Sequence, residues 1–271
     1  SGRGLKFNHS PVRITAAEHK INIRQPEKIT IMETDALAEV KPDIVIVVAY
    51  GLMLTKEFMS VPKYGCINVH PSLLPRWRGA APIQRAIESG DKLTGITIMK
   101  MEERLDAGDI IYQEPIKISD NDSSATLHEK CIKIGIDCLL LTLDSILANN
   151  FMIHPQDENL VTYAKKIKKE EAKIDWDMPA ELIHKKIMAF NSWPVAETML
   201  SGERVRIHDS EYKELKVNGI PGNIKSLNNN LIEVFTKDGL LIIKKLQKDS
   251  SKILDSVDFI NSTELKGKRF E

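Results

Sequence analysis

Apolar, strand-like runs alternate with helical segments between residues 43 and 150, and this alternation limits the possible folds more than any other feature. The run Asp43–Ala49 is rich in β-branched residues, as in strands that are covered on both faces of a parallel sheet. Gly95–Met101 and Ile110–Ile118 also have the composition of strands, and Ser123–Asn150 has apolar residues at helical spacing. The pattern predicts an α/β domain with a doubly wound, mostly parallel sheet. Shorter predicted elements are helices at 11–20, 35–40 and 81–89 and a strand at 21–24.

The chain changes character near Asn150. The segment 151–173 is polar and rich in lysine, which is typical of a linker. A helix is predicted at 180–190, and it is followed by short alternating segments that end in turns, as in a small β-barrel. We therefore expect three parts: a first domain at 1–149, a basic linker at 150–168 and a second domain at 169–271.

The bulk composition excludes several classes of protein. Lysine plus arginine and aspartate plus glutamate number 38 each, so the overall charge does not indicate a nucleic-acid partner and local clusters must do so. The three cysteines are odd in number and lie in apolar surroundings, which predicts buried free thiols in a reducing compartment. The sequence has neither a membrane span nor a signal peptide, so we expect a cytoplasmic protein that does not bind membranes.

Asn68 and His70 lie two residues apart at the end of the strand-like run 65–70, just before Pro71. Residues two apart in a strand project to the same side, and open parallel sheets bind ligands at the carboxyl ends of their strands. An amide can donate a hydrogen bond to a developing oxyanion, and an imidazole exchanges protons near neutral pH. This pair therefore predicts a catalytic site, whereas either residue alone is explained as well by a turn cap or a core histidine.

Asp106 is the best third member of this site, because a carboxylate can set the orientation and charge of an imidazole. It lies in the loop after Gly95–Met101, which in a parallel sheet opens on the same edge as the loop after His70. Gly108 lets this loop turn back tightly. The alternative for Asp106 is a turn-forming aspartate, and Asp109 is a competing candidate.

Other chemistries lack their motifs. Ser72 is outside the strained G-x-S-x-G turn that a nucleophilic serine needs, and Cys66 lies inside an apolar strand. The remaining histidines are scattered singly, so we expect no metal site. The glycines of a dinucleotide-binding loop do not follow any strand.

The motif Asn-Val-His at 68–70, the Ser-Leu-Leu-Pro at 72–75 and Asp106 resemble the catalytic pattern of 10-formyltetrahydrofolate-dependent formyltransferases. The strings at 72–85, 160–164 and 169–176 are similar to the branch of that family that acts on methionyl-tRNA. The resemblance covers essentially the whole chain. It implies a Rossmann-like formyltransferase domain followed by an OB-like β-barrel that binds tRNA. Family members begin with a strand–helix–strand unit before the loop that 1–6 resembles, so the resemblance implies that this unit is missing here.

The resemblance also implies the reaction and its residues. The formyl group of 10-formyltetrahydrofolate moves to the α-amine of methionine on initiator tRNA by direct attack, in a cytoplasmic monomer without a metal. Asn68 donates to the formyl oxygen, His70 stabilises the oxyanion and manages the proton, and Asp106 orients His70 and favours its cation. The folate is expected near Tyr50, Gly51, Ser72, Leu73, Leu74 and Pro75. The tRNA is expected near Arg3, Arg76, Arg78, Lys165 and Lys166, with solvated structural arginines as the alternative for Arg76 and Arg78.

Four other interpretations remain. Glycinamide ribonucleotide formyltransferase, sugar-nucleotide formyltransferases and the folate-hydrolysing domain of formyltetrahydrofolate dehydrogenase share the chemistry. The string 77–82 and the second domain argue against the first and the last. A non-catalytic tRNA-binding protein is the alternative from another class, and the presence of Asn68, His70 and Asp106 argues against it.

Overall fold

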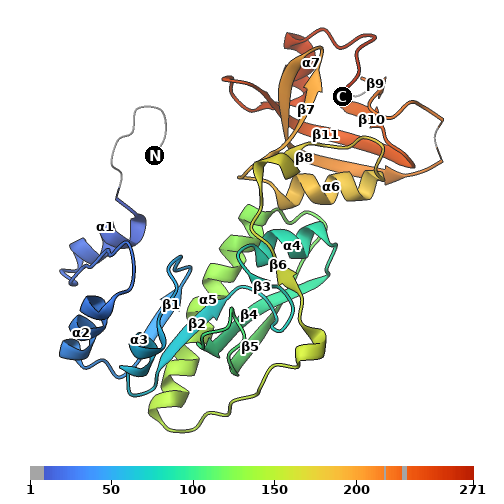
Figure 1. Cartoon of the computed structure of the whole chain (residues 1–271). Coiled ribbons are helices and arrows are strands. Elements are labelled where there is room, and N and C mark those ends of the chain that lie inside the picture. Colours follow the sequence, from blue (N-terminus) through green and yellow to red (C-terminus); the bar gives the residue numbers. More distant parts are fainter. Residues whose placement is uncertain (1–8, 217, 228–230) are drawn as a thin grey trace. The chain divides into compact units, whose positions relative to one another are not determined.

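A computed structural model describes residues 9–216, 218–227 and 231–271 (Figure 1). The chain divides into two compact units. The first comprises the chain up to Val45 together with residues 50–65, and the second comprises residues 46–49 and 66–271. In the part of the chain that the structure describes, no helix combines the length and the apolar character needed to cross a membrane.

The first unit contains three short helices, α1 (Pro11–Glu18), α2 (Ile31–Val40) and α3 (Lys56–Ser60). The Ser10 hydroxyl accepts a hydrogen bond from the Arg13 amide at the start of α1, as the sequence predicts. α2 begins earlier than predicted because Thr30 and Glu33 form a capping box. The strand predicted at 21–24 is wrong: Ile21 and Ile23 are exposed, and none of the described strands pairs with this segment.

The second unit begins with a four-stranded sheet in the order β1 (Val45–Val48), β2 (Cys66–His70), β4 (Leu93–Lys100) and β5 (Ile110–Lys117). The α/β class is confirmed, but the β2–β4 and β4–β5 pairings are antiparallel, unlike the mostly parallel sheet that the sequence predicts. The connections explain this difference. The chain turns at residues 101–109, so β5 returns antiparallel to β4, and β4 itself runs opposite to β2. β1 lies at the edge of the sheet, where Val47 is buried and Val48 is exposed, so it is not covered on both faces.

Helix α5 (Ser124–Leu147) covers one face of this sheet, and α4 (Pro82–Glu88) precedes β4. A Cβ at Gly135 of α5 would lie 3.5 Å from Val69 and 3.7 Å from Ile96, which places these side chains under the helix. Asn68 and His70 alternate with Val69 and therefore project from the opposite face. The site face of the sheet is thus the face that α5 does not cover.

All three cysteines are free and buried, as predicted. Cys66 lies in β2, and Cys131 and Cys138 lie in α5. Burial raises the pKa of Cys66 and of Cys131 to about 11, so both remain protonated at neutral pH.

The segment predicted as a linker is held against the first sheet domain. It contains the 3₁₀ turns η1 (Glu158–Leu160) and η2 (Lys169–Ala172) and the short strand β6 (Tyr163–Ala164). β6 pairs in parallel with β3 (Arg78–Gly79), and Ala164 and Ile167 are buried. The lysine-rich composition of this segment concealed these packed positions.

The C-terminal part is an antiparallel sheet with the order β7-β8-β11-β10-β9, and β12 pairs with β11. Trp176 stacks on Phe270 in its core, with ring centroids 5.6 Å apart. The isolated bridges Leu200↔Phe270 and Asn223↔Arg269 join the two edges of the sheet, so the described residues form an open sheet with bridged edges rather than a regular closed barrel. The elements are α6 (Ala180–Ala189), β7 (Ala196–Leu200), β8 (Glu203–Glu214), β9 (Ile224–Ser226), β10 (Ile232–Phe235), β11 (Gly239–Lys248), β12 (Leu254–Asp255) and α7 (Ser256–Ser262).

Candidate active site

His70 and Asp106 lie together, although they are far apart in the sequence. The Nδ1 atom of His70 is 3.7 Å from Oδ2 of Asp106, and both side chains are largely buried. Asp109, the competing candidate, takes part in the β4–β5 hairpin, where its carbonyl oxygen accepts a hydrogen bond from the Lys100 amide. The geometry therefore favours Asp106 as the partner of His70.

The chain reaches this arrangement by a different route from the one that the sequence predicts. Because β2 and β4 are antiparallel, Lys100 lies opposite Ile67, and the loop after β4 begins at the end of β2 remote from His70. This loop must fold back over the site face to bring Asp106 to His70. Gly108 is required for the turn, since a Cβ there would overlap the carbonyl oxygen of Lys100.

Two contacts from other segments hold Asp106 in place. The Gly79 amide donates a 2.8 Å hydrogen bond to Oδ2 of Asp106. The side-chain amide of Gln156 donates hydrogen bonds of 2.8 Å to the carbonyl oxygens of both Asp106 and Gly108. Sequence reasoning missed Gln156 because it lies in a polar segment whose composition indicates a linker, and it missed Gly79 because a backbone amide has no sequence signature.

The protonation state of His70 follows from its surroundings. Its Nε2 atom lies 2.9 Å from the Trp77 carbonyl oxygen, which can only accept, so Nε2 carries a proton. Burial lowers the pKa of His70, and the Asp106 carboxylate and the Trp77 carbonyl oppose this effect without overcoming it. The ring is therefore neutral at pH 7, and Nδ1, beside Asp106, is free to accept a proton.

Asn68 is half-buried on the same face as His70. Its side-chain amide makes no hydrogen bond with any other described residue, whereas most buried polar groups in proteins are paired. An amide with open donor capacity beside a neutral imidazole can bind the oxygen of a reacting carbonyl group.

The loop after β2 contains the residues predicted to bind folate, and it is fastened to the sheet. The Ser72 hydroxyl donates to the Arg76 carbonyl oxygen (2.7 Å), and the Thr97 hydroxyl donates to the Ser72 carbonyl oxygen (2.6 Å). The Gln113 amide donates to the Leu74 carbonyl oxygen and to the Thr97 hydroxyl, both at 2.9 Å. These bonds fix the loop from Ser72 through Leu73 to Pro75, and they commit the Ser72 hydroxyl to a structural contact.

The predicted tRNA-binding residues have different environments. Arg76 forms a two-pronged contact with Asp91 and lies over the Trp77 ring, with 4.4 Å from its guanidinium carbon to the ring centroid. Arg78 is 2% exposed, so it is buried and differs from the solvated arginine expected as the alternative. Lys165 and Lys166 are exposed. Tyr50 and Gly51, predicted to bind folate, belong to the first unit, and Arg3 lies outside the described residues.

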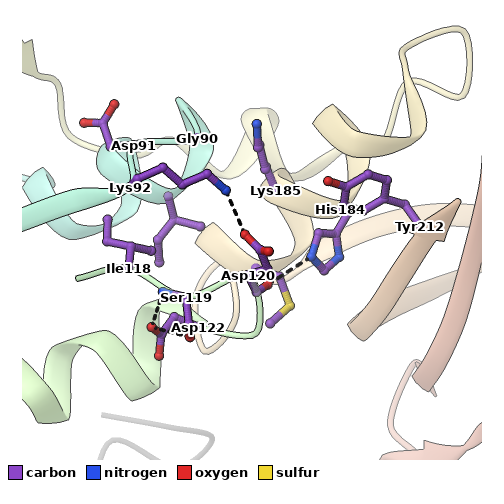
Figure 2. Close-up of a pocket in the computed structure, with 12 residues that line it drawn as sticks. Gly90, Asp91, Lys92, Ile118, Ser119, Asp120, Asp122, His184, Lys185 and Tyr212 are labelled. Carbon is purple, nitrogen blue, oxygen red and sulfur yellow. Dashed lines mark hydrogen bonds and ion pairs between the residues drawn. The ribbon is translucent and has the colours of Figure 1, made fainter. Parts of the chain in front are cut away.

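A separate pocket lies in the second unit, where the end of β5 approaches α6 and β8 (Figure 2). Two of its charged groups pair with each other: the Lys92 ammonium is 2.8 Å from the Asp120 carboxylate. Nδ1 of His184 is 3.0 Å from the Ser210 hydroxyl, and Nε2 is 3.4 Å from the Asp120 carbonyl oxygen. His184 is thus a structural histidine, as the sequence predicts for the scattered histidines.

Comparison with known proteins assigns the chain to a family. The family model "Formyl transferase" matches residues 1–143, and the model "Formyl transferase, C-terminal domain" matches residues 166–264. The chain therefore belongs to the formyl transferase family.

Its curated relatives include methionyl-tRNA formyltransferases. The protein of that name from Hydrogenovibrio crunogenus is 42% identical over 268 residues, which cover 98% of this chain and 86% of the relative. The one from Methylococcus capsulatus is 42% identical over 270 residues, covering 99% of this chain and 87% of the relative. These similarities confirm the resemblance found in the sequence motifs.

Two solved structures share the fold. An N-formyltransferase from Helicobacter canadensis, in complex with folinic acid and dTDP-3-aminofucose, matches with a TM-score of 0.69 and 19% identity over 92% of this chain and 86% of its own. HypX from Aquifex aeolicus, in complex with tetrahydrofolic acid, matches with a TM-score of 0.67 and 23% identity over 93% of this chain and 44% of its own. At these identities the likeness concerns the fold alone.

Proposed function

We propose that this protein transfers the formyl group of 10-formyltetrahydrofolate to the α-amine of methionine on initiator methionyl-tRNA. The relatives at 42% identity support this substrate pair. The observation that carries the chemistry is the open amide of Asn68 on the same face as the buried His70–Asp106 pair. A site with one oxyanion donor and one proton acceptor suits acyl transfer to an amine.

The first step forms a bond between the amine nitrogen and the formyl carbon. The carbonyl π electrons move to the formyl oxygen, which becomes an oxyanion, and the Asn68 amide donates a hydrogen bond to it. Loss of one such donor typically raises the barrier by about 3–4 kcal/mol. Asn68 therefore acts on the state in which charge has developed.

The second step moves a proton and breaks a bond. Nδ1 of His70 takes the proton that the attacking nitrogen must lose, directly or through a water molecule, and the Asp106 carboxylate stabilises the imidazolium. The oxyanion then collapses, the bond from the formyl carbon to N10 of the folate breaks, and His70 returns the proton to N10. Tetrahydrofolate leaves, and the enzyme regains its starting state.

Direct attack by the substrate amine needs no nucleophile from the enzyme. The nearby serine and cysteine side chains are not suited to that role. The Ser72 hydroxyl is bonded to a backbone carbonyl oxygen, and the raised pKa of Cys66 keeps its thiol protonated.

The substrate contacts follow from the resemblance and from exposure. We propose that the folate binds along the loop after β2, and the resemblance alone adds Tyr50 and Gly51 to its contacts. The tRNA phosphates are proposed to bind Lys165 and Lys166, with Arg76 and Arg3 near the acceptor end. We assign residues 1–149 to the catalytic domain and 169–271 to the tRNA-binding domain, with the basic segment 150–168, whose strand β6 pairs with β3 of the catalytic domain, between them. The enzyme acts as a cytoplasmic monomer in translation initiation.

The test is release of tetrahydrofolate by the purified protein with 10-formyltetrahydrofolate and different acceptors. We expect release with methionyl-tRNA and only background release with glycinamide ribonucleotide, a nucleotide-linked amino sugar or no acceptor. Release with a different acceptor or without one would favour the corresponding rival. Binding of methionyl-tRNA without any release would favour a non-catalytic tRNA-binding protein.

The linker lysines give an independent test of tRNA binding. Lys165→Glu with Lys166→Glu is expected to weaken tRNA binding and to reduce the dependence of log K on log salt by about one for each phosphate that the variant no longer neutralises. Turnover at saturating tRNA should stay unchanged. Lys117→Glu, an exposed position at the end of β5, is the matched control. Equal weakening in the control would refute the assignment.

A further inference from the structure

The loop that carries Asp106 has to be held over the sheet, because it starts at the far end of β2 from His70. Asp106 also has a left-handed backbone, with φ 49°, a conformation that is uncommon for residues other than glycine although aspartate tolerates it better than most. The contacts that impose this conformation therefore decide whether the carboxylate reaches the imidazole.

Gln156 supplies two of these contacts. The residue is 9% exposed, and its amide nitrogen donates to the carbonyl oxygens of Asp106 and Gly108, both at 2.8 Å. Its amide oxygen accepts a 2.9 Å hydrogen bond from Nε of Arg78. The amide nitrogen also lies 3.9 Å from the sulfur of Met99, which pairs with Asn68 across β2 and β4. Gln156 therefore lies between the loop and the site face of the sheet.

Arg78 connects Gln156 to the backbone amide that holds the carboxylate of Asp106. Arg78 is 2% exposed and pairs with Glu158 at 3.2 Å. The next residue, Gly79, donates its amide to Oδ2 of Asp106. Asp106 is thus held at its backbone by Gln156 and at its carboxylate by Gly79, and the buried Arg78–Gln156 bond joins these two supports.

We propose that Gln156 is a positioning residue for formyl transfer, which keeps the Asp106 carboxylate beside Nδ1 of His70. This inference rests on the proposed function. A side-chain amide is required because the position needs two donors for carbonyl oxygens and one acceptor for Arg78. A carboxylate lacks the donors and an ammonium lacks the acceptor.

Replacing Gln156 should destabilise the reacting state and leave substrate binding unchanged. If Gln156 is replaced by a residue without an amide, the loop relaxes and Asp106 moves away from His70, so the imidazolium loses its main stabilising charge. The turnover number should then fall while the Michaelis constants stay near their normal values. The pKa of His70 should also decrease further.

The experiment compares Gln156→Met with Gln247→Met in the full chain. Gln247 on β11 also uses both ends of its amide, donating to the Ser251 carbonyl oxygen and contacting Nε2 of His208. For Gln156→Met we expect kcat to fall about a hundredfold, as for displacements of about 1 Å at a site. Both Michaelis constants should stay within about twofold. Gln247→Met should keep the wild-type kcat, and NMR titration should show a lower His70 pKa in Gln156→Met alone.

Gln156→Asn is the conservative variant, since it retains both amide functions on a side chain one methylene shorter. We expect its kcat to lie between those of the wild type and Gln156→Met. If Gln156→Met does not fold, Gln156→Asn is the variant that is compared with the wild type. A folded Gln156 variant with wild-type kcat and an unchanged His70 pKa would overturn the inference. An inactive wild-type protein would instead refute the proposed function, while the His70 titration would still report on Gln156.

Discussion

The charge of Asp106 can be removed with little change to its other contacts, which makes Asp106→Asn the sharpest test of the site. The asparagine oxygen can still accept from the Gly79 amide, and asparagine tolerates the left-handed backbone at φ 49° better than most residues. The substitution therefore isolates the interaction between the carboxylate and His70.

The distance sets the magnitude. Two unit charges separated by the 3.7 Å between His70 and Asp106 attract by about 4 kcal/mol at an effective dielectric constant of about 20. His70 is neutral in the resting protein because burial lowers its pKa, so this attraction develops only when the ring takes the proton. Interactions that exist only in the reacting state lower the barrier, and we expect kcat to fall roughly a thousandfold with little change in either Michaelis constant.

The assay is single-turnover formylation of methionyl-tRNA at saturating folate, with Asp109→Asn as the matched control. Asp109 lies in the same loop and contributes its backbone to the hairpin, so its variant should keep kcat within a few-fold of wild type. NMR titration should show a lower His70 pKa in Asp106→Asn. Turnover within tenfold of wild type, or an equal loss in the control, would refute the role of Asp106.

Three further predictions concern the site and the fold. Asn68→Ala should lower kcat by about 10²–10³ while leaving folate binding intact, and near-normal turnover would remove Asn68 from the mechanism. His184 is buried with its pKa lowered by burial, so the unfolded chain binds its proton at higher pH than the folded chain. The melting temperature should therefore fall as pH drops below about 6.5, and His184→Gln should flatten this fall. If the dependence of the melting temperature on pH is the same in His184→Gln as in the wild type, His184 does not contribute to the loss of stability at low pH. Phe270→Ala removes a fully buried ring that stacks on Trp176 and should cost about 3–5 kcal/mol in urea unfolding, with a cost below about 1 kcal/mol contradicting this packing.

Local elements were largely predictable because their signals lie within a few neighbouring residues. Ser10 and Pro11 marked the start of α1, and the apolar spacing from 123 onward marked α5. The run 43–49 marked a strand, but composition did not show that β1 lies at an edge with Val48 exposed. Position in a sheet depends on which strands pair, and pairing partners leave no mark in a single strand.

The sequence by itself determined the class of fold, the free buried cysteines and the family motifs, and it proposed the three residues of the candidate site. Asn68 and His70 share a strand face by geometry alone, so no tertiary information was needed to group them. Only the tertiary structure decided the antiparallel course of β4, the return of the 101–109 loop and the burial of Arg78. Gln156 and Asp106 are 50 residues apart, and their contact depends on how β3, the loop and the extended segment pack on one sheet face. Such contacts arise from burial and hydrogen-bond pairing across the folded chain, and no local pattern of residues encodes them.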